Sequence, residues 1–119
     1  MVSKMKFGTN QKWIIRPDTH PLVRRMLGEV FGGTPKSPRP GLEIFTFAGG
    51  EHVGLFIEAD APDAPTYAKT AWLEFSVDDI DKTAKLLESA GVSRVHYDAD
   101  HEHLYFQAGA SPVFRLAKK

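Results

Sequence analysis

The stretch WLEFSVDDIDKTAKLLESAG, residues 72–91, decides the fold because its hydrophobic period changes partway along. Over residues 72–77 every second residue is apolar, which predicts a half-buried strand. From Ile80 onward the apolar residues recur three and four positions apart, which predicts a helix. Asp78 is a suitable N-cap and Gly91 a suitable C-terminal stop. We therefore expect a strand that passes directly into a helix.

The second face of this predicted strand is unusual. Leu73, Phe75 and Val77 make an ordinary core stripe, whereas the opposite face carries Trp72, Glu74 and Ser76. A one-sided sheet normally presents polar residues on its second face, so the large indole needs an explanation other than the core.

Composition limits the function classes. The chain has 119 residues, enough for one domain, 1–119, with its own core. Its 15 Lys and Arg balance 15 Asp and Glu, so it lacks the basic field that holds nucleic acid or an anionic membrane. It has no cysteine, which excludes disulfides and a cysteine nucleophile. The start, MVSKMKFGTNQ, has no apolar segment, so we expect a soluble cytoplasmic protein.

Residues 5–60 contain one set of predicted elements. FGTNQKWIIRP (7–17) is rich in β-formers and ends at a proline, which predicts a strand. THPLVRRMLGEVFGG (19–33) has helical apolar spacing and ends in two glycines. TPKSPRPG (34–41) allows only an edge strand or a loop, and we favour a connecting loop. LEIFTFAGGEHVGLFIEAD (42–60) predicts a hairpin.

Residues 71–119 repeat this order of elements. APDAPTYAK has two prolines and no period, so residues 61–70 predict a linker. After the strand and helix come SRVHYDAD (93–100), a short strand, and HLYFQAGASPVFRL (103–116), a hairpin. A unit of strand, helix, strand and strand covers only one sheet face with a helix. The other face needs its twin, a second chain or a ligand.

With these elements in place, the sequence resembles the vicinal oxygen chelate superfamily, which includes glyoxalase I, bleomycin-resistance proteins and extradiol dioxygenases. WLEFSVDDIDKTAKLLESAGV (72–92) has its strand-to-helix pattern, and LYFQAGASPVFRL (104–116) follows its closing hairpin, Y-F-x-D-P-D-G-x-x-x-E-L. VFGG (30–33) and HVGLFIEAD (52–60) match more loosely. The resemblance implies an α+β fold of glyoxalase/bleomycin-resistance type, in which paired βαβββ modules form a curled mixed sheet shaped as a cup. A second chain often completes that cup, so we expect a homodimer.

Metal-dependent members of this superfamily hold their ion in the cup, usually with two histidines and two glutamates. The matching positions of this sequence are Trp72, Arg115 (in VFRL, where V-F-E-L is expected), Phe56 (or Glu58 after a slip of two), and Gln11 or Lys12. An indole has no lone pair for a metal, and a guanidinium repels one. The resemblance therefore predicts a cup without the usual metal ion and without another cofactor.

The odd strand face is explained if it lines the cup. Trp72 and Phe56 would offer area to a planar or amphipathic small molecule, and Arg115 and Glu74 would orient it. The alternative is that Arg115 and Glu74 form only a cross-strand ion pair and that Trp72 fills space. We favour a small-molecule-binding protein, by analogy with the antibiotic-sequestering branch. The predicted ligand-binding residues are Trp72, Glu74, Arg115, Phe56, Glu58, Gln11 and Lys12.

Two other functions stay open. One is a structural or partner-binding domain with a filled cup; the other is a metal-dependent lyase, isomerase or dioxygenase with unusual ligands such as Glu58, Glu74, His96 or His103. VHYDADHEH (95–103) has the imidazole and carboxylate groups that bind zinc or iron. It falls at a predicted strand end and turn, however, where polar residues are expected without a metal. A solvated turn is the preferred interpretation.

Overall fold

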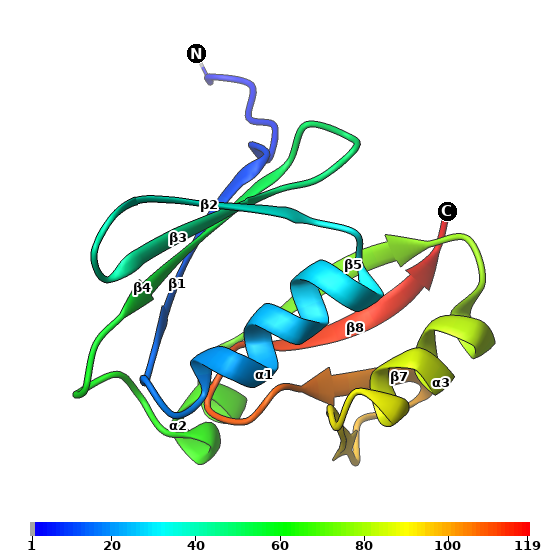
Figure 1. Cartoon of the computed structure of the whole chain (residues 1–119). Coiled ribbons are helices and arrows are strands. Elements are labelled where there is room, and N and C mark those ends of the chain that lie inside the picture. The colour runs from blue at the N-terminus through cyan, green and yellow to red at the C-terminus, as the bar shows by residue number, and fades with distance from the viewer. Residues whose placement is uncertain (1) are drawn as a thin grey trace.

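The computed structural model describes residues 2–119, which form two four-stranded mixed sheets, three α-helices and one π-helix (Figure 1). Sheet A has the strand order β1-β4-β3-β2, and sheet B the order β5-β8-β7-β6. The strands of sheet A are β1 (Asn10–Ile15), β2 (Thr34–Arg39), β3 (Leu42–Thr46) and β4 (His52–Ile57). Those of sheet B are β5 (Trp72–Val77), β6 (Ser93–Tyr97), β7 (Asp100–Gln107) and β8 (Val113–Lys118).

The two sheets repeat one topology. In each module the first strand lies parallel to the last, β1 against β4 and β5 against β8, and the other neighbours are antiparallel. The predicted α+β fold of paired βαβββ modules is therefore confirmed. Each four-stranded sheet of residues 2–119 has two free edges, so neither closes into a barrel.

The first predicted helix changes its winding partway. α1 (His20–Arg25) begins after Thr19, and η1 (Met26–Val30) continues it as a π-helix. Thr19 makes no side-chain cap, so Pro21 in the first turn is the start signal that acts there. Gly32 follows with a φ of 72°, a left-handed conformation that favours glycine and ends the helix as expected.

The proline-rich segment 34–41 contains a strand, so the favoured connecting loop is wrong. β2 is an edge strand that pairs only with β3, and its register shifts between Lys36 and Arg39. A proline has no backbone N–H to donate, but an edge strand needs partners on one side only. The edge position is therefore what makes the prolines acceptable.

The predicted linker contains a short helix, α2 (Ala64–Thr70). Asp63 caps it by accepting a hydrogen bond from the backbone N–H of Thr66 at 2.9 Å, and Pro65 lies in the first turn. α2 buries none of its side chains fully, so it has no apolar period that could be detected in the sequence. The hydroxyl of Tyr67 donates to the carbonyl of Ile14 and attaches α2 to β1.

The strand-to-helix passage in residues 72–91 is confirmed, with a shift of one residue at the cap. α3 (Ile80–Ser89) is capped by Asp79, whose side chain accepts a hydrogen bond from the backbone N–H of Lys82 at 3.0 Å. Asp78, the predicted cap, lies one residue too early. Gly91 has a φ of 91° just after the helix, as a C-terminal stop requires.

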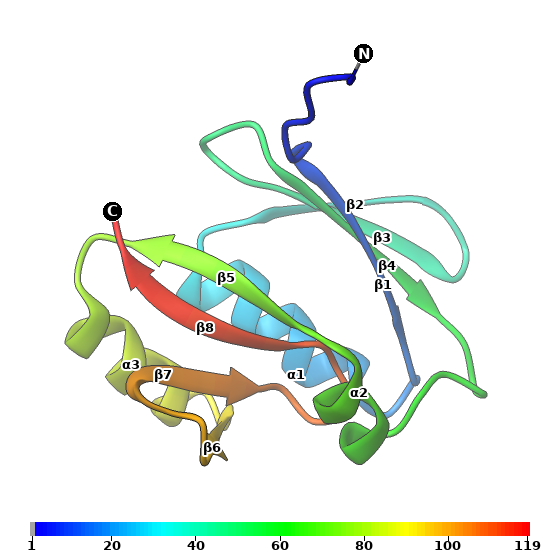
Figure 2. The same ribbon diagram turned by 180° about the vertical axis from the view of Figure 1, so that it is seen from behind.

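One hydrophobic core lies between the two sheets. α1 lies in front of β5 and β8 in Figure 1 and behind them in Figure 2. Trp13 of β1 stacks on Phe75 of β5 with ring centroids 6.3 Å apart. Phe31, just after η1, meets Phe75 and Phe114 edge-on at 5.3 and 5.9 Å. The sheet faces that carry these rings therefore point at the same core. α1 with η1, and α3, also pack their buried side chains into it.

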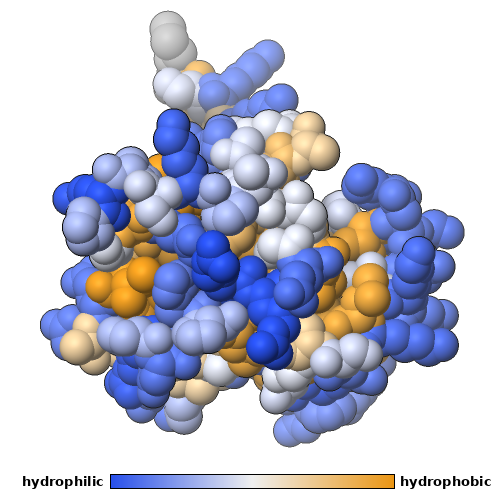
Figure 3. Space-filling view, viewed as in Figure 1, coloured by the Kyte–Doolittle hydropathy of each residue, from blue (hydrophilic) through white to orange (hydrophobic). Residues whose placement is uncertain are grey.

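The outer faces of the two sheets consequently point away from each other. Along β4, Val53 and Leu55 are buried in the shared core, whereas Gly54 and Phe56 on the other face are only partly covered. Polar and charged residues cover most of the surface seen in Figure 3, with apolar patches between them. None of the helices in residues 2–119 has the length and apolar character needed to cross a membrane.

Candidate functional site

Three aromatic rings gather on the outer face of sheet B. Tyr105 of β7 meets Trp72 of β5 at a ring-centroid distance of 5.8 Å and Tyr97 of β6 at 4.7 Å, both edge-on. Trp72 is 43% exposed, which is unusual for so large an apolar side chain. Trp72 is one of the predicted ligand-binding residues, whereas Tyr97 and Tyr105 are not. Strand alternation could have identified them, because it places each tyrosine on one defined face of its predicted strand.

Arg115 of β8 joins the charged groups of this face. Its Nε donates to Oε2 of Glu74 at 2.7 Å, its guanidinium carbon lies 4.2 Å from the ring centre of Trp72, and its Nη1 lies 3.6 Å from Oδ2 of Asp100. The hydroxyl of Tyr105 and then the carboxylate of Glu74 raise the pKa of Arg115, so it is a permanent cation. The ion pair with Glu74 is present, and the same arginine also makes a cation–π contact.

Asp100 connects this face to the histidine-rich segment. Its Oδ2 accepts hydrogen bonds from the hydroxyl of Tyr105 at 2.7 Å and from Nδ1 of His103 at 2.8 Å. Its Oδ1 accepts from the backbone N–H groups of Glu102 and His103 at 2.9 and 3.2 Å. The bond from Tyr105, followed by the backbone and His103 bonds, holds the pKa of Asp100 well below its usual range. The carboxylate in turn raises the pKa of Tyr105, so the phenol keeps its proton.

The histidine-rich segment 95–103 is a hairpin end, as predicted. β6 ends at Tyr97 and β7 begins at Asp100, so His96 and Asp100 lie on different strands. They do not share the strand face that a continuous strand would give them. His103 nevertheless has a defined partner in Asp100, which a fully solvated turn does not predict.

The outer face of sheet A holds the residues of the first module. Nζ of Lys12 lies 4.6 Å from the ring centre of Phe56. Glu58 follows the end of β4 and is exposed. Gln11 faces the core side instead, because its Oε1 accepts a hydrogen bond from the indole N–H of buried Trp13 at 3.0 Å. Of the two first-strand candidates, only Lys12 therefore lies on the outer face.

Strand register makes these positions equivalent in the two modules. Lys12 pairs across to the residue two before Phe56, and Trp72 pairs across to the residue two before Arg115. Lys12 thus corresponds to Trp72 on the first strands, and Phe56 to Arg115 on the last. Each module holds one cation against one aromatic ring, with the two roles exchanged.

A single chain does not bring the two sets together. Trp72, Glu74 and Arg115 meet on the outer face of sheet B, while Lys12 and Phe56 meet on the outer face of sheet A. The shared core lies between these faces. Any common lining of both sets therefore needs more than one copy of the chain.

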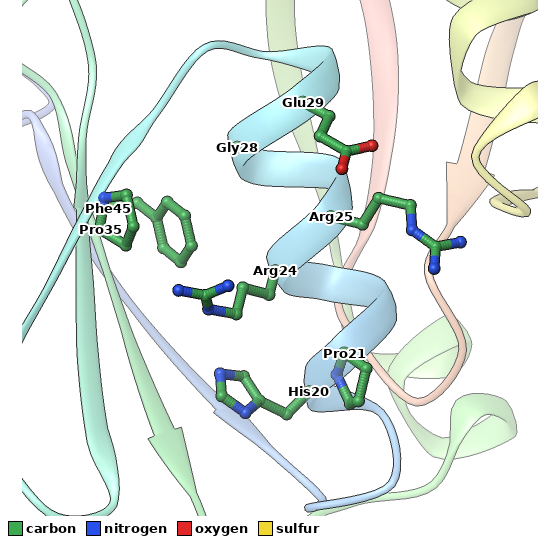
Figure 4. A pocket seen from close by; sticks show the side chains of 8 residues that line it. All are labelled: His20, Pro21, Arg24, Arg25, Gly28, Glu29, Pro35 and Phe45. Carbon is green, nitrogen blue, oxygen red and sulfur yellow. The ribbon is translucent and has the colours of Figure 1, made fainter.

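A cavity of about 400 Å³ opens between α1 and sheet A (Figure 4). His20 and Arg24 point into it from α1. Glu43 of β3, only 5% exposed, lies 2.8 Å from Nε2 of His20 and accepts from Nε of Arg24 at 2.9 Å. Burial alone would raise the pKa of Glu43, but the bonds to His20 and Arg24 outweigh it and lower the pKa. This ion group fastens α1 to the core side of sheet A.

Comparison with known families identifies the superfamily of this chain. The family model described as Glyoxalase/Bleomycin resistance protein/Dioxygenase superfamily matches residues 25–107, more than half of the chain. The chain belongs to this superfamily. No curated protein sequence matches it.

Solved structures with the same fold span nearly the whole chain. A protein assigned to the glyoxalase family from Bacillus anthracis has a TM-score of 0.70 at 16% identity, over 100% of this chain and 99% of that chain. The fosfomycin resistance protein FosX from Mesorhizobium loti has 0.65 at 17%, over 100% and 94%. FosX from Listeria monocytogenes, complexed with manganese(II) and 1S,2S-dihydroxypropylphosphonic acid, has 0.66 at 13%, over 98% and 90%. At these identities the similarity shows the fold alone.

The superfamily's metal does not fit the residues at the corresponding positions. Lys12 and Arg115 are cations, and the rings of Trp72 and Phe56 have no lone pair to donate to a metal. Each cation lies against a ring, so positive charge already occupies both places. Across residues 2–119 no three or more His, Asp or Glu side chains are arranged to hold a metal ion.

Proposed function

We propose that the protein binds a small planar or amphipathic organic molecule on the outer face of sheet B, without the superfamily's metal ion. The observation that carries this proposal is the pair of cation–π contacts, Arg115 on Trp72 and Lys12 on Phe56, at equivalent register positions. Trp72, which is 43% exposed, offers ring area for stacking, and Arg115 with Glu74 offers charged groups that orient a ligand.

The proposed role is binding without turnover, as in sequestration of an antibiotic. This role is supported by the residue types at the superfamily's metal positions. They are aromatic rings and cations, whereas a metal-dependent relative needs side chains with lone pairs there. The fosfomycin resistance proteins among the structural relatives support an antibiotic ligand through the fold only.

We also propose that a second copy of the chain completes the site. The outer face of sheet B is open and its Trp72 is 43% exposed, while the first-module residues lie on the other outer face. A two-fold dimer can place the sheet A face of one copy over the sheet B face of the other. Sedimentation equilibrium is expected to give a dimer, and a monomer at micromolar concentration would contradict this arrangement.

Tryptophan fluorescence tests the binding proposal because the two indoles have different environments. Trp13 is 2% exposed and Trp72 is 43% exposed. A compound that binds on sheet B should quench the wild-type protein strongly and the Trp72→Phe variant, in which Trp13 alone emits, very little. Equal quenching of both proteins would place the bound compound elsewhere. A library of aromatic compounds that produces no quenching at all would count against the proposed function.

A further inference from the structure

The direction of every hydrogen bond to Asp100 is defined, because an ionised carboxylate can only accept. Its two oxygens accept four bonds, from the Tyr105 hydroxyl, Nδ1 of His103 and two backbone N–H groups. A carboxylate can only accept, so each partner must donate. The proton of the neutral His103 ring therefore lies on Nδ1, which leaves Nε2 with a lone pair.

That lone pair is available to a ligand. The side chain of His103 is 38% exposed, and within residues 2–119 no group makes a hydrogen bond to its Nε2. His103 and Tyr105 are two residues apart on β7, so both belong to the outer face of sheet B. The neighbouring Arg115 donates from Nε to Glu74 and lies over the ring of Trp72. A molecule that approaches His103 thus meets an acceptor beside aromatic rings.

We propose that the ligand class of this face is a phenol, whose hydroxyl donates a hydrogen bond to Nε2 of His103. The inference rests on the proposed function and names its ligand. The aromatic ring of a phenol can stack on Trp72, whose side chain is 43% exposed, and its O–H matches the unpaired acceptor. A methyl ether or a carboxylate of the same ring has no proton to donate there. Asp100 and Tyr105 act by positioning the imidazole.

The first test is the tautomer itself. Long-range ¹H–¹⁵N correlation spectra near pH ~8, where an ordinary imidazole is neutral, should show His103 protonated on Nδ1. In the Asp100→Asn variant the amide can donate to Nδ1, so the proton is expected to move to Nε2. Protonation of Nε2 in the wild-type protein would overturn the proposal without any ligand being needed.

The second test compares two ligands that differ in one proton. Calorimetric titration at the same pH should give 2-naphthol an affinity roughly three- to tenfold higher than that of 2-methoxynaphthalene, the ratio expected for one net hydrogen bond. In His103→Leu the two affinities should become equal through loss of naphthol affinity alone. The matched control His96→Gln, which changes an exposed histidine on β6, should keep the wild-type ratio.

The outcomes separate this inference from the proposed function. Equal affinities in the wild-type protein refute selection by His103 and leave small-molecule binding intact. A preference that persists in folded His103→Leu, checked by circular dichroism, also refutes it. Failure of both compounds to bind counts against the proposed function and against the phenol class together.

Discussion

Replacing Glu43 with glutamine tests whether one buried carboxylate fastens α1 to sheet A. Glu43 is 5% exposed and is bonded to His20 at 2.8 Å and Arg24 at 2.9 Å. Glutamine keeps the shape but loses the charge, and its amide nitrogen meets a donor. A net hydrogen bond to a charged group contributes about 1.5–3 kcal/mol. The side chain of Arg24 is 53% exposed and can turn to water, so we expect a loss of about 2 kcal/mol in unfolding free energy.

This loss translates into a measurable melting shift. The unfolding entropy of a chain of this length is about 250 cal/mol/K, so the melting temperature of Glu43→Gln should fall by about 8 °C. Urea unfolding followed by circular dichroism gives the free energy directly. In an Arg24→Met background the same substitution should cost less, because one of the two bonds is already absent. A loss below about 0.5 kcal/mol in the wild-type background would refute the view that this ion group holds the helix.

Three further predictions concern pH, the indole and metal content. The pKa of Glu43 is lowered in the folded state, so its stabilisation is complete above the unfolded value near 4.3 and is lost as pH falls through the lowered value. As the pH is lowered, the difference in unfolding free energy between wild type and Glu43→Gln should therefore become smaller. A difference that stays constant with pH would contradict this dependence on the ionisation of Glu43. Trp72→Ala should abolish binding of aromatic compounds yet change unfolding free energy by less than about 1 kcal/mol, since the indole is 43% exposed; binding by the folded variant would remove Trp72 from the site. Mass spectrometric metal analysis of tag-free protein should find substoichiometric metal, whereas one tightly held ion per chain would favour the enzyme alternative.

Local pattern was sufficient for most of the fold. The change of period in residues 72–91 predicts β5 and α3, because alternation and helical spacing both reflect burial against one core. The repeat of element order predicts the second module in the same way. The incorrect predictions concern elements that bury no side chains fully, because such elements have no apolar period in the sequence. α2 has no fully buried residue, and β2 is exposed along its whole length.

The candidate site was only partly predictable. Trp72, Glu74 and Arg115 follow from strand alternation combined with the family resemblance, and they do meet. The contribution of Asp100 and Tyr105 was missed, because their contact depends on how the β6–β7 hairpin folds back and on the pairing of Tyr105 with Arg115. The choice between Gln11 and Lys12 likewise needed the register of β1 against β4.

By itself the sequence determined most of the elements, their duplication and the residue types that stand at the superfamily's metal positions, since these depend on residue type and on spacing along the chain. Only the tertiary structure decided which faces the elements share. It put both helix-covered sheet faces against one core, so the Lys12 and Phe56 pair and the Trp72 and Arg115 pair lie on outer faces that point apart. These features arise from contacts between strands, which residue spacing within one strand does not specify.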